Sequence, residues 1–250
     1  MKSIDLNCDM GELIGAANQD EALMPYISSC NICCGKHAGD DATIFKTVEA
    51  AVRHGLAIGA HPGYDDRENF GRVSHQLSQP AFRELIEQQL DFLQEKVVKA
   101  GGQLHHIKAH GALYHDLEQH EMYLETFLEI LSSYGTDLRV YGMAGTRHLN
   151  AYQSAGITFI PEAFADRRYA SPTLLVSRKQ KKALLASFPE MERQVLGLIS
   201  NQQITTLAKG IQRLVAKTLC IHSDTPNALK MLILLHQSLQ RHGIQIHSPQ

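Results

Sequence analysis

The most constraining feature of this 250-residue sequence is an alternation, from end to end, of short apolar runs with longer segments of helical periodicity. Short uninterrupted apolar runs are typical of parallel strands that are buried on both faces. The runs expected to form strands are 3–7, 26–31, 56–61, 104–108, 138–142, 157–162 and 218–222. Strands that alternate with helices predict right-handed crossovers and a parallel sheet.

The segments between these runs carry recognisable helix signals. An apolar stripe that includes Ile44 and Val48 follows Asp40 and is expected to stop at Gly55. A second helix is predicted to begin near Pro80 and to end at 101–102, where two glycines stand together. A third is predicted to begin at 225–226, a threonine N-cap followed by proline, and the segment 179–216 is expected to form two helices.

The chain length agrees with a barrel. About 250 residues is the usual size of a closed α/β barrel, but seven strands are one fewer than the eight-stranded form. Either one strand is not apparent or the barrel is incomplete. A doubly wound open sheet is the alternative, although no G-x-G-x-x-G motif follows the first strand and no Walker motif is present. No linker divides the chain, so residues 1–250 are expected to form a single domain.

Charge and composition exclude several functional classes. Lys and Arg number 24 against 26 Asp and Glu, which is far from the basic excess of a nucleic-acid-binding protein. No apolar run approaches the roughly 18 residues of a transmembrane helix, and Asp5 interrupts the position of a signal-peptide core. The five cysteines are an odd number, and Cys30-x-x-Cys33 has no second pair to complete a zinc site. We expect a cytoplasmic protein with reduced thiols.

Polar residues gather where the predicted strands end. In a parallel barrel these ends meet on one face, which is where chemistry takes place. Histidine follows four of the seven strands, as His37, His61, His110 and His222, each near glycines that allow close backbone approach to a ligand. The pattern predicts one functional site on this rim.

The ionisable residues of the rim suggest acid–base and anion-binding roles. The acid–base candidates are Asp9, Glu12, Asp40, Glu162 and Asp166. Lys108 could polarise a carbonyl group or hold an anion, and Arg167 suits a carboxylate or phosphate through its planar fork. For both cations the alternative is an ion pair that only fixes the loops.

A metal site is a further possibility. Asp9, His37 and His61 follow three consecutive strands and could supply a facial set of one oxygen and two nitrogen ligands. The alternative is that these residues are separately hydrogen-bonded and line a polar pocket.

Several strings, in this order, resemble the LamB/YcsF family, the A subunits of ATP-dependent bacterial 5-oxoprolinases. They are DLNCDMGE (5–12), SCNICCG (29–35), HAGD (37–40), GAHPG (59–63), FGR (70–72), KAHGALY (108–114), EAFADRRY (162–169) and CIHSD (220–224). The sequence departs from the family pattern in LIG (13–15), Lys36, Ala109, Ser223 and the segment 171–178. These departures affect the expected fit of the substrate more than the expected reaction.

The resemblance implies a seven-stranded, incomplete (β/α) barrel of the glycoside hydrolase/deacetylase type. It also implies ring opening of 5-oxo-L-proline to L-glutamate, driven by ATP hydrolysis, in a complex with B and C subunits. A divalent ion could accompany ATP as Mg²⁺ or occupy the site. On this hypothesis the catalytic residues are Asp9, Glu12, Lys108, His110, Glu162 and Asp166, and the substrate-binding residues are Asn7, Asn31, His37, Asp40, Arg167, His222 and Asp224.

Two alternatives remain open at the level of sequence. A metal-dependent carbohydrate deacetylase would need the Asp9, His37 and His61 site to hold an ion that activates water. A non-catalytic binding subunit of a lactam-utilisation complex would need none of the acid–base residues.

Overall fold

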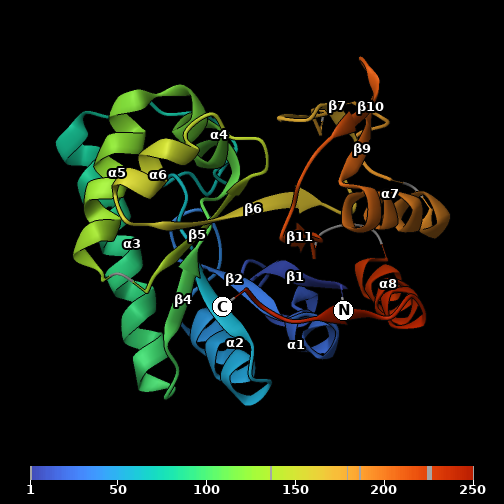
Figure 1. Ribbon diagram of the computed structural model, residues 1–250. Helices are drawn as coiled ribbons and strands as arrows, with labels where there is room; N and C mark the ends of the chain where they lie inside the picture. Colours follow the sequence, from blue (N-terminus) through green and yellow to red (C-terminus); the bar gives the residue numbers. More distant parts are fainter. Residues whose placement is uncertain (1, 136, 179, 186, 224–226, 250) are drawn as a thin grey trace.

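The centre of the computed structural model is a ring of parallel strands (Figure 1), and the residues described are 2–135, 137–178, 180–185, 187–223 and 227–249. The seven strands, in order around the ring, are β1 (Lys2–Met10), β2 (Ser29–Cys33), β3 (Ala57–His61), β4 (Leu104–Ile107), β5 (Arg139–Met143), β6 (Thr158–Phe164) and β11 (Thr218–Cys220). The ring closes where β11 pairs with residues 5–7 of β1, and β12 (Ile244–Ile246) pairs with residues 2–4 of β1. The α/β barrel with seven strands is confirmed.

The interior of the barrel is polar. Successive side chains of a strand point to opposite faces, so β1 directs Asp5, Asn7 and Asp9 inward and packs Leu6 and Cys8 toward the helices. All five of these side chains are buried. Asp5 accepts hydrogen bonds from hydroxyls on the neighbouring strands, while Asn7 and Asp9 form the layers above it. Because barrels of this type are usually filled by branched apolar residues, a polar interior suggests function.

Helices cover the outside of the barrel. They are α1 (Asp20–Leu23), α2 (Asp41–Arg53), α3 (Gln79–Lys99), α4 (Gly111–Gln119), α5 (Glu121–Ser133), α6 (Leu149–Ser154), α7 (Phe188–Asn201) and α8 (Ala228–Arg241), with short 3-10 turns at Gly15–Ala17 and Met24–Tyr26. The first predicted helix is confirmed as α2: Asp40 caps it through Thr43 N, and Gly55 follows its end with φ +66°. Pro80 lies in the first turn of α3, as predicted. Residues 225–226 lie outside the described part of the chain.

The expectation of two helices within 179–216 is wrong in its second half. One helix, α7, is present, but Gln202 follows it in the left-handed region at φ 53°. The chain then forms an antiparallel hairpin of β9 (Gln203–Thr206) and β10 (Gly210–Arg213). With β7 (Tyr169–Ser171) and β8 (Leu174–Leu175), this hairpin makes a second sheet in the order β10-β9-β7-β8.

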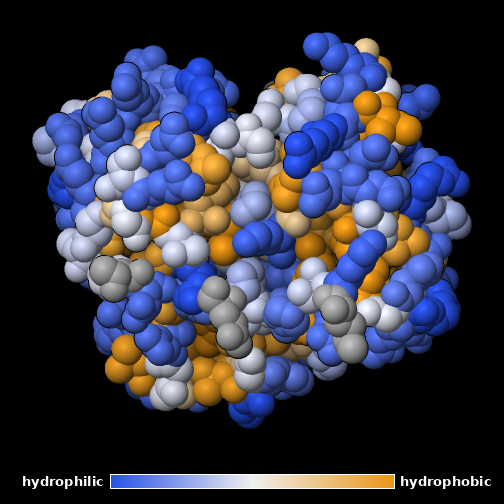
Figure 2. Space-filling view, in the orientation of Figure 1, coloured by the Kyte–Doolittle hydropathy of each residue, from blue (hydrophilic) through white to orange (hydrophobic). Residues whose placement is uncertain are grey.

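The second sheet stands above one side of the barrel, across from the start of α4 (Figure 1). The space-filling view is hollowed between these two parts (Figure 2). In the described part of the chain, no helix combines the length and the apolar character that crossing a bilayer would require.

Candidate active site

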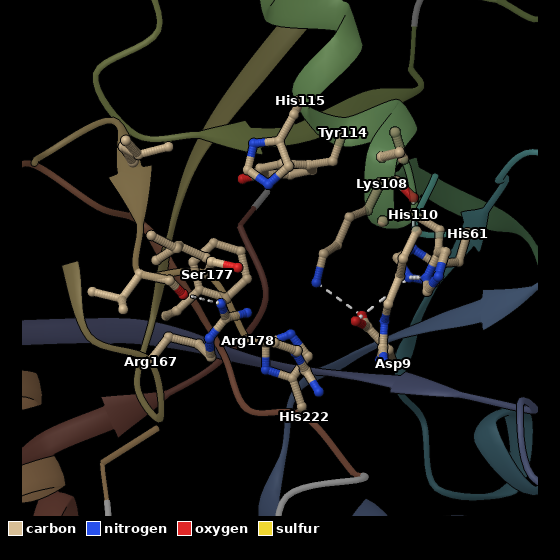
Figure 3. Close-up of a pocket in the computed structure, with 18 of the residues that line it drawn as sticks. Asp9, His61, Lys108, His110, Tyr114, His115, Arg167, Ser177, Arg178 and His222 are labelled. Atoms are coloured by element: carbon tan, nitrogen blue, oxygen red, sulfur yellow. Dashed lines mark hydrogen bonds and ion pairs between the residues drawn. The ribbon is translucent and has the colours of Figure 1, made fainter. Parts of the chain in front are cut away.

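The hollow leads to a cavity of about 600 Å³ at the carboxyl ends of the barrel strands. Its lining comes from the strand ends, the first turns of α4 and the segment around β8, and consists of Asp9, Glu12, His61, Arg72, Lys108, Ala109, His110, Gly111, Ala112, Tyr114, His115, Gln119, Phe164, Arg167, Leu174, Leu175, Val176, Ser177, Arg178, His222 and Ser223. Figure 3 shows the Lys108 and histidine groups on one side and arginines with His222 on the other. The predicted rim therefore does line one cavity in large part.

Lys108, directly after β4, lies between two buried carboxylates. Its Nζ is 2.8 Å from Asp9 Oδ1 and 3.0 Å from Glu162 Oε1. Burial opposes ionisation of Asp9, but its interactions with His61 and Lys108 outweigh that effect and hold the pKa of Asp9 well below its usual value. Burial would lower the pKa of Lys108, yet Asp9 and other neighbouring acidic groups raise it well above normal. These shifts favour the charged forms of both Asp9 and Lys108.

Asn7 and Asn31 lie beneath this cluster. Asn7 Nδ2 donates to Glu162 Oε1 at 2.9 Å, and Asn31 Nδ2 donates to Asp9 Oδ1 at 2.8 Å. His106 Nε2 in turn lies 2.7 Å from Asn31 Oδ1. Both amides are fully buried, so the geometry supports their orienting the carboxylates, whereas the sequence suggested substrate binding.

Glu12 is the centre of a second cluster, formed with three imidazoles. Glu12 Oε1 lies 3.3 Å from His37 Nε2, 3.3 Å from His110 Nδ1 and 3.9 Å from His61 Nε2. The rings of His37 and His110 stack with their centroids 3.8 Å apart. Burial would raise the pKa of Glu12, but hydrogen bonds from His110 and His37 lower it far below normal. Burial lowers the pKa of His37 to about 4, although Glu12 opposes that shift.

On the opposite side, Asp166 holds His222. Both carboxylate oxygens of Asp166 lie 3.1 Å from His222 Nδ1, and the His222 backbone N–H donates to Oδ2 at 3.2 Å. The His222 ring also stacks on the Phe164 ring, with the two ring centroids 5.6 Å apart. Asp166 is fully buried while His222 lines the cavity, so the carboxylate orients the imidazole.

Arginines form the remaining wall. Arg167, Arg178 and Arg72 all line the cavity. Arg167 is 7% exposed and donates through Nη2 to Val176 O at 2.8 Å, while its buried Nε has no hydrogen-bond acceptor among the described residues. Burial lowers the pKa of Arg167, and the charge of Arg178 adds to that effect. This wall can receive an anionic group of a ligand.

Two of the predicted substrate-binding residues are not part of the described site. Asp40 lies away from the cavity, and Asp224 lies outside the described residues. Asp40 is exposed at the N-terminus of α2, where its side chain accepts from Thr43 N at 2.8 Å, and this hydrogen bond lowers its pKa. Its position is that of a helix cap.

The sequence interpretation missed several residues of the site. Cys220 Sγ lies 3.1 Å from Lys108 Nζ, and His106 supports Asn31. The two-residue period of strands could have found both, because His106 shares a strand face with Lys108 and Cys220 shares one with His222. Arg72, Arg178, Tyr114 and His115 come from loops and a helix, where the sequence pattern gave no comparable signal.

Two groups of side chains are compact enough to hold a metal ion. They are Glu12 with His61 and His110, and Asp9 with Cys220 and His222, each with ligand atoms within 4.8 Å of one another. The expected triad of Asp9, His37 and His61 is divided, since Asp9 lies 3.4 Å from His61 Nε2 while His37 contacts Glu12. A metal at that triad stays a prediction.

Together the walls offer complementary chemistry. One side holds an ammonium, ionised carboxylates and imidazoles. The other side holds guanidinium groups that can fix a carboxylate or phosphate. Such an arrangement suits hydrolysis of a small anionic substrate.

Known proteins of similar length resemble this chain in sequence, and one of them in structure. The A subunit of 5-oxoprolinase from Bordetella parapertussis is 37% identical, and the one from Shouchella clausii is 39% identical, each over 98% of both chains. The crystal structure of the lactam utilization protein from Thermus thermophilus superposes with a TM-score of 0.90 at 30% identity, covering 99% of this chain and 100% of that one. The LamB/YcsF family model matches residues 4–250. The chain therefore belongs to the LamB/YcsF family.

Proposed function

We propose that this chain is the A subunit of an ATP-dependent 5-oxoprolinase, which opens the lactam ring of 5-oxo-L-proline to give L-glutamate. The observation that carries the proposal is the position of Lys108 between Asp9 and Glu162 at one side of a cavity whose other side contains the buried Arg167. The full-length similarity to the A subunits of 5-oxoprolinases supports the substrate.

The substrate has features that match the two walls. Its α-carboxylate is a planar anion, which suits the fork of Arg167. Its lactam carbonyl gains negative charge when a nucleophile attacks, and the Lys108 ammonium is a fixed, buried cation that can stabilise that charge. A carbonyl held toward Lys108 and a carboxylate held toward Arg167 would place the ring across the cavity.

Proton movement is best assigned to imidazoles. Asp9 and Glu12 have lowered pKa values, so they are weak proton acceptors and act mainly by holding charge in place. His110 contacts Glu12 and lines the cavity, and an imidazole can accept a proton from water and deliver it to a departing amine. Asp166 supports the same kind of role for His222 on the facing wall.

ATP is needed because a lactam is a stable amide. Transfer of the γ-phosphoryl group to the carbonyl oxygen, with release of ADP, would make the ring carbon electrophilic. Water would then add to that carbon, the C–N bond would break as the nitrogen takes up a proton, and a second water would hydrolyse the resulting acyl phosphate to glutamate and phosphate. We assign ATP, with its Mg²⁺, to the complex that this chain forms with B and C subunits. The relatives are themselves subunits of an enzyme, which supports a multi-subunit assembly.

A reconstitution assay tests the proposal. The purified chain mixed with B and C subunits from the same organism should consume 5-oxoproline and ATP together and release glutamate, whereas each component alone should not. An absence of coupled turnover with these partners would overturn it. A Lys108→Ala assembly that retains full activity would instead favour a non-catalytic binding subunit, and acetate release from an acetylated sugar without ATP would favour a deacetylase.

A further inference from the structure

Two histidines of the Glu12 cluster have their protonation pattern fixed by backbone carbonyls. His61 Nδ1 lies 2.7 Å from Lys108 O, and His110 Nε2 lies 2.8 Å from Phe70 O. A carbonyl oxygen can only accept a hydrogen bond, so these two nitrogens must carry the hydrogen. In a neutral imidazole the other nitrogen then presents a lone pair.

Those lone pairs face one another. His61 Nε2 and His110 Nδ1 are 3.0 Å apart, and Glu12 Oε1 lies 3.3 Å from the His110 atom and 3.9 Å from the His61 atom. With both rings neutral, three acceptor atoms converge in a buried place without a donor between them. This arrangement requires a positive charge, which is either an additional proton on one ring or a metal cation.

The spacing fits a metal cation. A tetrahedral ion with ligands at about 2.1 Å separates its ligand atoms by about 3.4 Å, and the three separations here are 3.0, 3.3 and 3.9 Å. Two imidazoles and one carboxylate are a common donor set for a catalytic zinc site that keeps one position open. All three residues line the cavity, so the open position would face a ligand.

The surroundings of these residues fit as well. Histidines that bind metals usually donate their second N–H to a carbonyl or carboxylate, as His61 and His110 both do. His37 contacts Glu12 Oε1 and stacks on His110, which fixes both of them. Gly63 leaves room for this packing, because a Cβ there would lie 2.7 Å from His37 Nδ1.

The other compact group, Asp9 with Cys220 and His222, already contains a cation. Lys108 Nζ lies 2.8 Å from Asp9 Oδ1 and 3.1 Å from Cys220 Sγ. A metal ion would have to displace this ammonium or share its ligands. Substitutions in the Glu12 group and in the Asp9 group should therefore affect metal binding differently.

We propose that Glu12, His61 and His110 bind one divalent first-row transition-metal ion, with His37 as a positioning residue. The bound ion would supply a Lewis acid toward an oxygen atom of a ligand in the cavity. The proposal concerns metal binding by this chain alone and is tested without the lactam reaction. An ion bound at His110 Nδ1 would take that ring out of proton transfer and leave His222 as the imidazole that moves protons.

Metal binding by the purified chain tests the proposal. After treatment with a chelator, the chain is loaded with Zn²⁺ or Mn²⁺, desalted and analysed for metal content, and affinity is measured by calorimetry. We expect about one ion per chain and a rise in the midpoint of thermal unfolding. Less than about 0.1 ion per chain with both metals would overturn the proposal and favour a shared proton.

Variants locate the ion. Glu12→Gln and His61→Asn should each weaken binding at least about 100-fold, and His37→Asn should weaken it about 10- to 100-fold. His222→Asn is the matched control from the other group and should bind like the wild type. Loss of binding in His222→Asn with retention in His61→Asn would overturn the assignment. Circular dichroism of each apo variant verifies that it is folded, and His110→Asn replaces any variant that is not.

Discussion

Lys108 Nζ lies 3.0 Å from Glu162 Oε1, and the side chains are 3% and 0% exposed. Lys108 follows β4 and Glu162 belongs to β6, with β5 between them in the sheet, so the ion pair spans the barrel interior. A buried pair of this kind costs solvation energy and is weak evidence for stability. Its position at the wall of the cavity supports a role in function.

The first prediction concerns the removal of this ammonium. Lys108→Met leaves Asp9 and Glu162 without a cation that both of them contact. We expect the free energy of unfolding to fall by about 3 kcal/mol and the coupled 5-oxoprolinase activity to fall at least about 100-fold. Urea unfolding and steady-state assays measure the two effects.

Lys36→Met is the matched control, because Lys36 forms an exposed ion pair with Asp65 at 2.9 Å. Its unfolding free energy should change by no more than about 0.5 kcal/mol. If Lys108→Met were as active as this control, the catalytic role of Lys108 would be refuted.

Much of the barrel is predictable from the sequence because short buried segments alternate with helical periodicity, although β1, β2 and β4 carry polar residues such as Asp5, Asn31 and His106 into the interior. β9 and β10 were missed for a physical reason. Leu207 and Ile211 of their hairpin are apolar, exposed and four residues apart, which is also the spacing of one face of a helix. In addition, a single residue, Gln202, separates α7 from β9. This left-handed residue is not a glycine, which is the usual sequence signal for such a break.

The candidate site was predictable where its residues lie at or just after the carboxyl ends of strands: Asp9 and Glu162 lie near the ends of β1 and β6, and Lys108 and His222 follow β4 and β11. The contacts between site residues were not predictable, because they depend on which side chains the closed barrel brings together. The contact between Asp166 and His222 joins the end of β6 to the end of β11, residues that are far apart in sequence. Asp40, by contrast, looked like a site residue because helix caps and active-site carboxylates both occur after strands.

The second prediction concerns this Asp166 and His222 pair. Asp166→Asn keeps the size of the side chain but removes the charge that faces His222 Nδ1. We expect kcat to fall about 10- to 100-fold, because the imidazole loses the partner that fixes its orientation and its tautomer. Steady-state kinetics of the reconstituted complex measure this effect.

A double-mutant cycle separates coupling from general damage. If Asp166 acts through His222, the Asp166→Asn/His222→Asn double variant should be no less active than His222→Asn alone. If the kcat of the double variant were reduced by the product of the two single-variant reductions, the two residues would act independently.

The third prediction concerns the guanidinium of Arg167. Arg167→Lys keeps the charge but loses the planar fork that binds a carboxylate at two points. We expect the KM for 5-oxoproline to rise at least about 10-fold while kcat changes less than about threefold. Arg53→Lys is the matched control, since Arg53 forms an exposed pair with Glu21. An unchanged KM in Arg167→Lys would exclude Arg167 from substrate binding.

The last prediction concerns Asp20, a buried carboxylate behind the Glu12 loop. Asp20 Oδ2 accepts from Gly11 N at 2.6 Å and from Asn18 Nδ2 at 3.1 Å. Burial raises its pKa to about 6, although the hydrogen bond from Gly11 opposes the shift. The folded protein therefore binds the Asp20 proton more tightly than the unfolded chain does.

The sign of the pH dependence follows from this difference. Between the unfolded pKa near 4 and the folded pKa of about 6, the folded state holds more protons, so the unfolding free energy falls as the pH rises. The shift of about two units corresponds to about 3 kcal/mol, and the stabilisation present below pH 4 is lost above pH 6.

Asp20→Asn should remove this contribution while its amide oxygen still accepts from Gly11 N. Urea unfolding from pH 4 to 7 should thus give a flatter profile for Asp20→Asn than for the wild type or an exposed control, Asp65→Asn. Parallel profiles for Asp20→Asn and the wild type would mean that Asp20 does not titrate in this range, and that Gly11 is held by a carboxylate that is ionised throughout.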